Sequence, residues 1–521
     1  MLLMYCHAKL KNISQHTVIS AHLFLPDYSP MNRDSFYPAI ACFPLLLMLA
    51  GCATMHETRQ ALSQQTPAAQ VDTVLPTALK NGWPDSQWWL EYHDNQLTSL
   101  INNALQSAPD MQVAEQRIQL AEAQAKAIAT QDGPQLDFSA DMERQKMSAE
   151  GLMGPFALND PAAGTTGPWY TNGTFGLTAG WHLDIWGKNR AEVTARLGTV
   201  KARAAEREQT RQLLAGSVAR LYWEWQTQAA LNTVLQQIEK EQNTIIATDR
   251  QLYQNGITSS VEGVETDINA SKTRQQLNDV AGKMKIIEAR LNTLTNHQTK
   301  SLKLKPVALP KVASQLPDEL GYSLLARRAD LQAAHWYVES SLSTIDAAKA
   351  AFYPDINLMA FLQQDALHLS DLFRHSAQQM GVTAGLTLPI FDSGRLNANL
   401  DIAKAESNLS IASYNKAVVE AVNDVARAAS QVQTLAEKNQ HQAQIERDAL
   451  RVVGLAQARF NAGLIAGSRV SEARIPALRE RANGLLLQGQ WLDASIQLTG
   501  ALGGGTNADD MRLLYLTFVE R

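Results

Sequence analysis

Four stretches of the chain alternate strictly between apolar residues and polar or small ones, which is the period-two pattern of β-strands. The clearest apolar positions are Phe175, Leu177, Ala179, Trp181 and Leu183 in one stretch and Val382, Ala384, Leu386 and Leu388 in another. Residues 135–142 and 355–363 alternate in the same way and are their expected partners. The pattern predicts two β-hairpins, 135–183 and 355–389. An ordinary half-buried sheet would show the same alternation, so the strands alone do not identify their surroundings.

Two further stretches carry apolar residues at the 3-and-4 spacing of a coiled-coil seam. The first covers residues 193–252, where Arg207 and Arg211 interrupt the seam, and the second includes residues 418–432. A helix over about 190–252 would be roughly 90 Å long at 1.5 Å per residue. Such a helix must pack against neighbours along its whole length.

The chain repeats itself at a nearly constant spacing. Asp110 and Asp330 are 220 positions apart, as are Pro134 and Pro354, whereas Gly256 and Gly463 are 207 apart. The octapeptides LDIWGKNR (183–190) and LPIFDSGR (388–395) are 205 apart. The chain is therefore interpreted as a duplicated unit, with about 15 extra residues in a Gly- and Pro-rich loop of the first copy. Gly256 and Gly463 are expected to be the tip turns of two helical hairpins.

The two octapeptides are interpreted as corners where a strand turns into a long helix. Asp392 or Ser393 is suited to cap the second of these helices, because short polar side chains accept hydrogen bonds from the first backbone N–H groups. The corner residues singled out are Trp186, Gly187, Arg190, Phe391, Asp392, Gly394 and Arg395.

The N-terminal region resembles a bacterial lipoprotein signal. A charged start at Met31 precedes the apolar run AIACFPLLLMLA, which closes on LAGC at Cys52; the run is too short to span a membrane permanently. Residues 1–30 are interpreted as an upstream start artefact. The resemblance implies that Cys52 becomes a lipidated N-terminus and that Ala53 directs the protein to the outer membrane. Cys52 would then be the mature chain's sole cysteine, which excludes an intrachain disulfide.

Composition narrows the possible environments. The chain is 45% apolar with a formal net charge of −5, so it has no electrostatic footprint for nucleic acid. After Cys52 there is no run of about 18 apolar residues, and any membrane crossing would have to use β-strands. Four strands leave two open edges, which are too costly in hydrocarbon. Two chains would give eight strands and a filled interior, whereas three would give twelve strands and a channel.

The sequence resembles the outer-membrane efflux factors, the family of the TolC and OprM channels, and within it the NodT-type lipoprotein branch. The matching stretches are LAGC, WWLEYHDNQLTSLINNAL (88–105), DIWGKNR, RADLQAAHWYV (328–338), AKAAFYPDINL (348–358), PIFDSGRLNANL (389–400) and ALGGG (501–505). The resemblance implies a homotrimer that docks on a periplasmic adaptor (a membrane fusion protein) and an inner-membrane efflux pump, and that exports drugs through the outer membrane.

The expected fold is mainly α with membrane β. Long coiled-coil hairpins would form a periplasmic tunnel, and four strands per chain would contribute to a trimeric 12-stranded transmembrane β-barrel in contact with outer-membrane lipid. The expected segments are a signal peptide at 31–51, an N-terminal periplasmic segment at 52–108, a first repeat at 109–295, an inter-repeat equatorial segment at 296–325, a second repeat at 326–502 and a C-terminal segment at 503–521.

The hairpin tips depart from the family pattern. By the resemblance, tip acids would fall at Glu262 and Glu265 in the first hairpin and at positions 469 and 472 in the second, where this chain has Arg469 and Glu472. Glu262 and Arg469 are therefore expected to attract each other and favour a closed tip. The alternative is that Arg469 is a solvated helix residue. Pro476 is expected to interrupt the second returning helix.

Other functional classes fit the sequence less well. The histidines are scattered and neither an HExxH nor a CxxC motif occurs, so no catalytic site, metal or cofactor is expected, and Asp392 is not assigned as a catalytic acid. His368 and His375 are expected near an outer loop. A passive outer-membrane porin and a type I secretion exit duct for peptides or proteins are the alternatives. A coiled-coil scaffold would leave the strands unexplained.

Overall fold

The computed structural model describes residues 62–63, 86–146, 169–257, 260–296, 302–310 and 328–504. By its contacts the chain divides into residues 1–54 and residues 55–521, and all the described residues belong to the second unit. The expected start artefact, signal peptide and lipidated Cys52 therefore lie outside the described residues.

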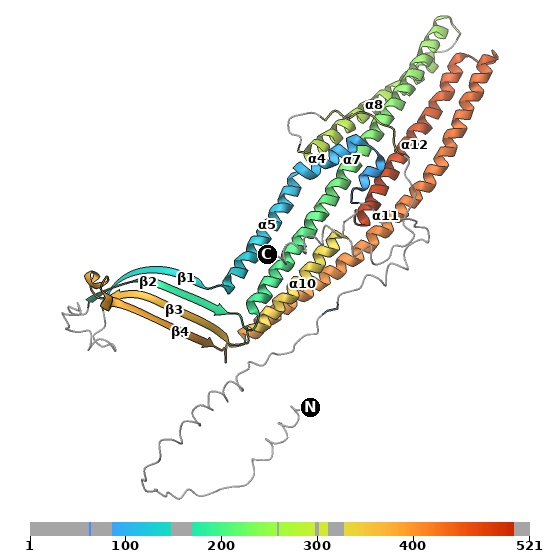
Figure 1. Ribbon diagram of the computed structural model, residues 1–521. Coiled ribbons are helices and arrows are strands. Elements are labelled where there is room, and N and C mark those ends of the chain that lie inside the picture. Colours follow the sequence, from blue (N-terminus) through green and yellow to red (C-terminus); the bar gives the residue numbers. More distant parts are fainter. Residues whose placement is uncertain are drawn as a thin grey trace, which may run out of the picture. The chain divides into compact units, whose positions relative to one another are not determined.

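Each half of the chain has the order helix, two strands, long helix and shorter helix (Figure 1). The first half begins with the short helix η2 (Trp88–Tyr92) and α4 (Asn95–Ser107). It continues with α5 (Pro109–Ala129), η3 (Thr130–Asp132), β1 (Gln135–Lys146), β2 (Trp169–Leu183), α7 (Lys188–Gln254) and α8 (Ser260–Leu294). The second half comprises α10 (Ala329–Ala350), β3 (Asp355–Ala366), η5 (Leu369–Asp371), η6 (His375–Ala377), β4 (Gln378–Thr387), α11 (Arg395–Asn461) and α12 (Gly467–Ala501).

The duplication is more regular in the structure than in the sequence. α5 and α10 begin 220 positions apart, and α7 and α11 begin 207 apart and are both 67 residues long. The spacing of 205 used to align the two corners is therefore wrong for the helix starts. Arg395 is equivalent to Lys188 rather than to Arg190, because seven residues separate β4 from α11 whereas four separate β2 from α7.

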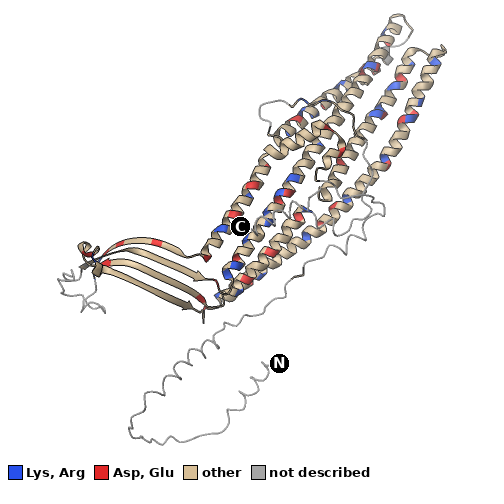
Figure 2. Cartoon of the chain, in the orientation of Figure 1, with Lys and Arg blue, Asp and Glu red and all other residues tan. Residues whose placement is uncertain are grey.

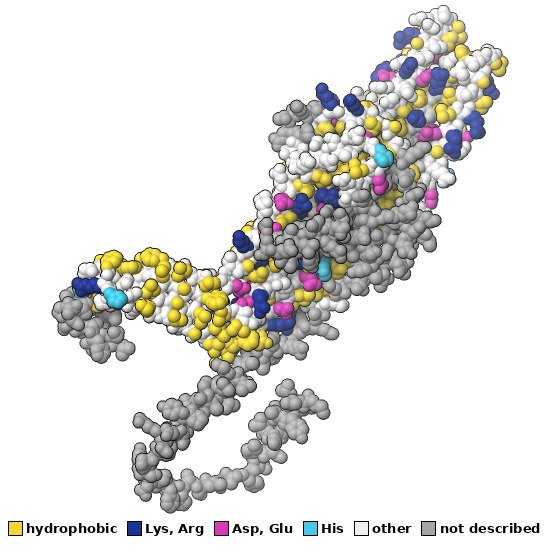
Figure 3. Space-filling view, in the orientation of Figure 1, with side chains coloured by type: hydrophobic (Ala, Val, Ile, Leu, Met, Phe, Trp, Pro, Cys, Tyr) yellow, Lys and Arg dark blue, Asp and Glu magenta, His cyan; other side chains and the backbone are white. Residues whose placement is uncertain are grey.

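The four strands form one antiparallel sheet in the order β1-β2-β3-β4. Residues of like polarity lie side by side across it: Phe138 pairs with Leu177, Leu177 with Leu362, and Leu362 with Met380. Phe138 is 67% exposed and Met380 69% exposed in the protomer. Hydrophobic side chains cover much of the visible face of the sheet (Figure 3). This exposed apolar face, alternating with a polar one, is typical of strands that contact lipid.

The helices lie side by side, with the long helix α7 in contact with α5, α8, α10 and α12. The long helix α11 contacts α10 and α12. On α11 the predicted seam is found at Val418, Val425 and Val432, which are all buried. On α7 the predicted stripe accounts for only part of the buried surface, because α4, α5, α8, α10 and α12 all contact the helix and residues 225–229 are buried consecutively.

The arginines and the proline that break these patterns are accommodated within the helices. Arg207 forms an ion pair with Glu115 of α5 at 3.1 Å, and Arg211 forms one with Glu208 at 2.6 Å. Pro476 lies inside α12, which continues unbroken through it, so the expected interruption is wrong. A proline removes one backbone hydrogen bond, whereas α12 packs against both α7 and α11.

Candidate functional site

The first corner is held by an aspartate and a tryptophan. Asp184 accepts a hydrogen bond from the backbone N–H of Arg190 at 2.9 Å and thereby caps α7. Trp186 stacks on Tyr353 with ring centroids 4.9 Å apart, and its Nε1 donates to the carbonyl of Pro354 at 2.8 Å. Because Tyr353 and Pro354 precede β3, these contacts join the corner of the first repeat to the second repeat.

The second corner uses a different cap. Asp392 accepts hydrogen bonds from the backbone N–H groups of Gly394 at 3.0 Å and Leu396 at 2.8 Å. Asp392, rather than Ser393, thus satisfies the first N–H groups of α11. Gly394 and Gly187 precede the two long helices with φ of +88° and +75°, a conformation that glycine adopts at little cost. Phe391 is 87% exposed, and Arg395 is the first residue of α11.

The tips of the two helical hairpins have the same backbone geometry. In the first, the N–H of Gly256 donates to the carbonyl of Tyr253, and the N–H of Ile257 to that of Leu252, both at 2.9 Å. This is a Schellman motif, in which a left-handed glycine ends a helix. Gly463 ends α11 with the same pair of hydrogen bonds, and its φ is +72°.

The tip charges are placed as follows. Arg469 forms an ion pair with Glu472 of the same helix at 2.7 Å, with their side chains 67% and 40% exposed. Glu265 is exposed on α8. The side chain of Glu262 lies outside the described residues, so its attraction to Arg469 remains a prediction.

A strap formed by residues 302–310 crosses the helices and is held by Gln96, Gln226 and Gln488. Gln96 accepts from the N–H of Lys305 at 2.9 Å and donates to its carbonyl at 3.1 Å. Gln226 of α7 also donates to the Lys305 carbonyl, at 3.0 Å, and accepts from the N–H of Val307 at 2.8 Å. The strap therefore follows one face of the helices, where a cluster of tryptophan, tyrosine and leucine side chains is buried.

A carboxylate links this region to α7. Asp94 caps α4 by accepting from the N–H groups of Gln96 and Leu97, and it also accepts a hydrogen bond from the Tyr222 hydroxyl at 2.7 Å. Burial, and then the hydrogen bond to Asp94, raise the pKa of Tyr222. Burial, with a contribution from Glu91, raises the pKa of Tyr92 to about 12.

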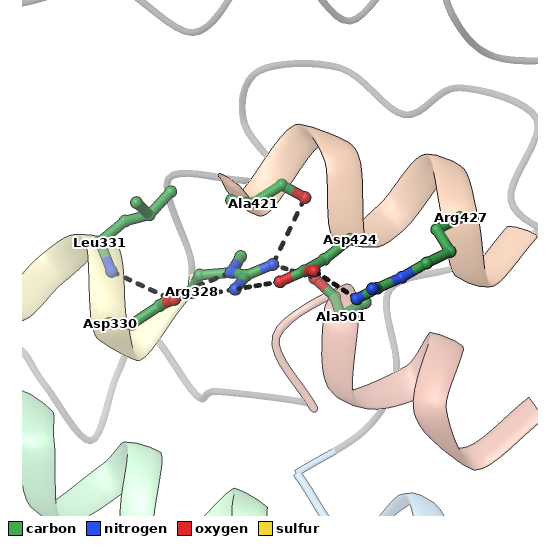
Figure 4. Close-up of polar contacts among 7 residues, drawn as sticks. All are labelled: Arg328, Asp330, Leu331, Ala421, Asp424, Arg427 and Ala501. Atoms are coloured by element: carbon green, nitrogen blue, oxygen red, sulfur yellow. Dashed lines mark hydrogen bonds and ion pairs between the residues drawn. The ribbon is translucent and has the colours of Figure 1, made fainter. Parts of the chain in front are cut away.

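In the second repeat, one arginine side chain contacts three helices (Figure 4). Arg328, at the start of α10, forms an ion pair with Asp330 at 2.8 Å and contacts Asp424 of α11 at 3.7 Å. It also donates to the carbonyl of Ala501 at 3.0 Å and to that of Ala421 at 3.5 Å. A cation at the last carbonyls of α12 is favoured by the helix dipole. Arg328 thus joins α10, α11 and α12.

The described residues contain no group of three or more His, Cys, Asp or Glu side chains that could hold a metal ion. None of the described helices combines the length and the apolar character needed to cross a membrane. Charged side chains occur along the helices and are few on the strands (Figure 2). His368 and His375 lie in the connection between β3 and β4.

Sequence reasoning missed Asp184, Arg328 and Tyr353 as structural contacts. Asp184 falls within the corner motif, and an aspartate shortly before a helix start is a capping signal. Arg328 and Tyr353 carry no comparable signal, because their partners are distant in sequence.

A sheet with an exposed apolar face, joined to helices of 67 residues, defines a subunit of an outer-membrane channel whose β-barrel is continued by a helical tunnel. Residues 100–297 and 320–504 match the family described as outer membrane efflux protein. The chain belongs to this family, and the two matched stretches correspond to the two repeats.

Curated relatives and solved structures agree with this assignment. The multidrug resistance outer membrane protein MdtQ of Escherichia coli O6:H1 is 99% identical over 475 residues, which cover 91% of this chain and 99% of that protein. MdtP of Shigella flexneri is 36% identical and covers 88% of this chain and 95% of its own length. The crystal structure of the outer membrane protein VceC from Vibrio cholerae is 25% identical, with a TM-score of 0.69 over 82% of this chain and 100% of that one. The outer-membrane channel OprN, at 21% identity, shares the fold with a TM-score of 0.74 over 86% of this chain and 99% of its own.

Replacing Asp392 with alanine is expected to destabilise the start of α11 by about 1 kcal/mol, because two backbone N–H groups lose their acceptor. The midpoint of thermal unfolding, followed by circular dichroism of the purified protein, should fall. Asp401→Ala is the matched control, since Asp401 is an exposed aspartate further along the same helix. Equal midpoints for the two variants would show that the cap contributes nothing.

Proposed function

We propose that the chain is the outer-membrane exit channel of a tripartite drug efflux system. Toxic compounds would pass from an inner-membrane pump and a periplasmic adaptor through its helical tunnel to the outside. The observation that carries the proposal is the combination of lipid-type strands with two 67-residue helices, each about 100 Å long at 1.5 Å per residue. Its relative MdtQ carries the name of a multidrug resistance protein.

The assembly is proposed to be a homotrimer. β1 and β4 each pair on one side only among the described strands, and such edges need partners in a membrane. Twelve strands from three chains leave room for a passage, whereas eight strands from two chains are filled by their own side chains. A passive porin would have no use for helices of this length. A type I secretion duct shares the architecture and differs only in what it carries.

Two measurements test this function. The mass of the purified protein in detergent should correspond to three chains, and a stable folded monomer would contradict the architecture. Deleting the gene in a strain that lacks its main efflux channel should raise sensitivity to a set of toxic compounds, and the cloned gene should reverse the change. A strain that loses export of a peptide or protein, with unchanged drug sensitivity, would favour the secretion duct.

Cys52 is proposed to carry the lipid that anchors the mature N-terminus in the outer membrane. The support is the sequence that precedes it, a charged start, a short apolar run and LAGC. Cells grown with labelled palmitate should incorporate label into the wild-type protein and not into Cys52→Ala. Undiminished labelling of the variant would refute the assignment.

Arg469 and Glu262 are proposed to stabilise the closed tip between neighbouring hairpins, by about 1 kcal/mol for a hydrated pair. Arg469→Glu would place like charges together, open the resting tip and sensitise cells to vancomycin. Adding Glu262→Arg should restore closure. Lys272→Glu is the control, because it makes the same charge change at an exposed position further along α8.

The competing contact is the ion pair of Arg469 with Glu472 within α12. If Arg469 serves only its own helix, the single variant will leak no more than wild type at equal expression, and the second substitution will change nothing.

A further inference from the structure

A groove of about 760 Å³ lies between the long helices α7 and α11. α12 forms its floor with Leu486, Gly489, Gln490 and Asp493, while Glu224 and Trp223 come from α7 and Lys438 and Leu435 from α11. This volume lies within the range of small-molecule sites in proteins, about 300–1,000 Å³. Gly489 lets α12 approach α7 closely at this point, because an added Cβ would lie 2.6 Å from the Thr227 hydroxyl oxygen of α7.

The groove opens on the face of the helices that the strap does not cover. Gln488 of α12 donates to the carbonyl of strap residue Pro310 at 3.0 Å, and Gln226 of α7 bonds the strap at Lys305. Positions two apart on an α-helix point about 200° apart. Gln490 and Glu224 therefore point away from the strap, into the groove. If the helices close into a tube with the strap outside, the groove lines the passage.

Most charges around the groove are already paired. Arg220 of α7 is paired with Asp493 of α12, and Arg427 is paired with Asp424 at 2.7 Å. Glu224 and Lys438 have no ion pair or hydrogen bond among the described residues. The groove thus offers one carboxylate on its α7 wall and one ammonium group on its α11 wall.

Trp223 and Gln228 complete the lining as packed side chains, only 3% and 7% exposed. The unpaired Nε1 of Trp223 and Oε1 of Gln228 have no accessible surface, so the groove offers solutes the side chains of Glu224 and Lys438 as its unpaired charged groups among the described residues. Leu435 and Leu486 add apolar side chains to the lining.

We infer that this groove is a binding site for zwitterionic amphiphilic solutes, with Glu224 facing the cationic group, Lys438 the anionic group and the apolar residues the ring system between them. The inference rests on the proposed function, in which such solutes pass along the groove. We expect the affinity of the site for these solutes to be weak, because a channel must release what it binds.

The test uses the full-length protein purified in detergent and norfloxacin, which carries both an ammonium and a carboxylate near neutral pH. Isothermal titration should show saturable binding. Glu224→Gln and Lys438→Gln should each raise the Kd about fivefold, the effect of losing one hydrated ion pair. Glu437→Gln, which neutralises the exposed residue beside Lys438 outside the groove lining, should leave the Kd unchanged.

Nalidixate separates the two charges, because it has the carboxylate of a quinolone and no ammonium group. It should bind more weakly than norfloxacin and respond to Lys438→Gln but not to Glu224→Gln. Equal Kd values for wild type and both groove variants, or absence of saturable binding, would overturn the inference.

The outcomes also distinguish this site from the proposed function. Binding that depends on Glu224 and Lys438, together with unchanged drug sensitivity on gene deletion, would refute the efflux role and leave the site standing. Increased sensitivity on deletion without such binding would refute the site and leave the efflux role standing.

Discussion

The unpaired edges of the sheet set a requirement on which the rest of the structure depends. β1 and β4 each leave one row of backbone N–H and C=O groups without partners in the described protomer, and hydrocarbon supplies no hydrogen bonds in place of water. The apolar residues of the strands are nevertheless exposed, as at Val382, which is 81% accessible. Such a sheet is stable in lipid only as one sector of a closed barrel. The helices of each protomer then need only form one sector of a wall, which explains why they extend lengthwise instead of folding into a compact core.

The periodic features of this design could be predicted from the sequence. Alternation identified all four strands, and the seam on α11 predicted the buried residues Val418, Val425 and Val432. Local patterns report such elements well because each residue's environment repeats with the element's own period. α7 shows where this fails. Residues 225–229 are buried consecutively, where Trp225 contacts α8, Gln226 the strap and Thr227 α12. A helix covered on several sides has no single stripe for periodicity to detect.

The predictions for the two corners and for Pro476 were wrong for other reasons. Sequence identity aligns Arg190 with Arg395. The backbone instead aligns Gly187 with Gly394, because the left-handed φ of these glycines fixes where each long helix begins. Pro476 was expected to interrupt the second returning helix on local propensity, and tertiary packing overrides propensity in α12. In the candidate site, Asp392 could be identified as a cap because capping is local. The hydrogen bonds of Arg328 could not be predicted in this way, because their acceptors lie about 90 and 170 positions away in sequence, beyond any local capping pattern.

The two repeats have the same order of secondary-structure elements, but different polar contacts connect their helices. The position 220 before Arg328 is Ala108, which carries no charge; there the first repeat relies instead on α4, Asp94 and the strap held by Gln96 and Gln226. The strap occupies one face of the helical layer, and Arg328 sits at the end of α12 where three helices meet. The face that carries the groove also contributes to holding the helices, because Arg220 of α7 forms an ion pair there with Asp493 of α12. Glu224 and Lys438 take no part in these ion pairs and hydrogen bonds among the described residues, so they are groove residues that can change without removing a polar contact between the helices.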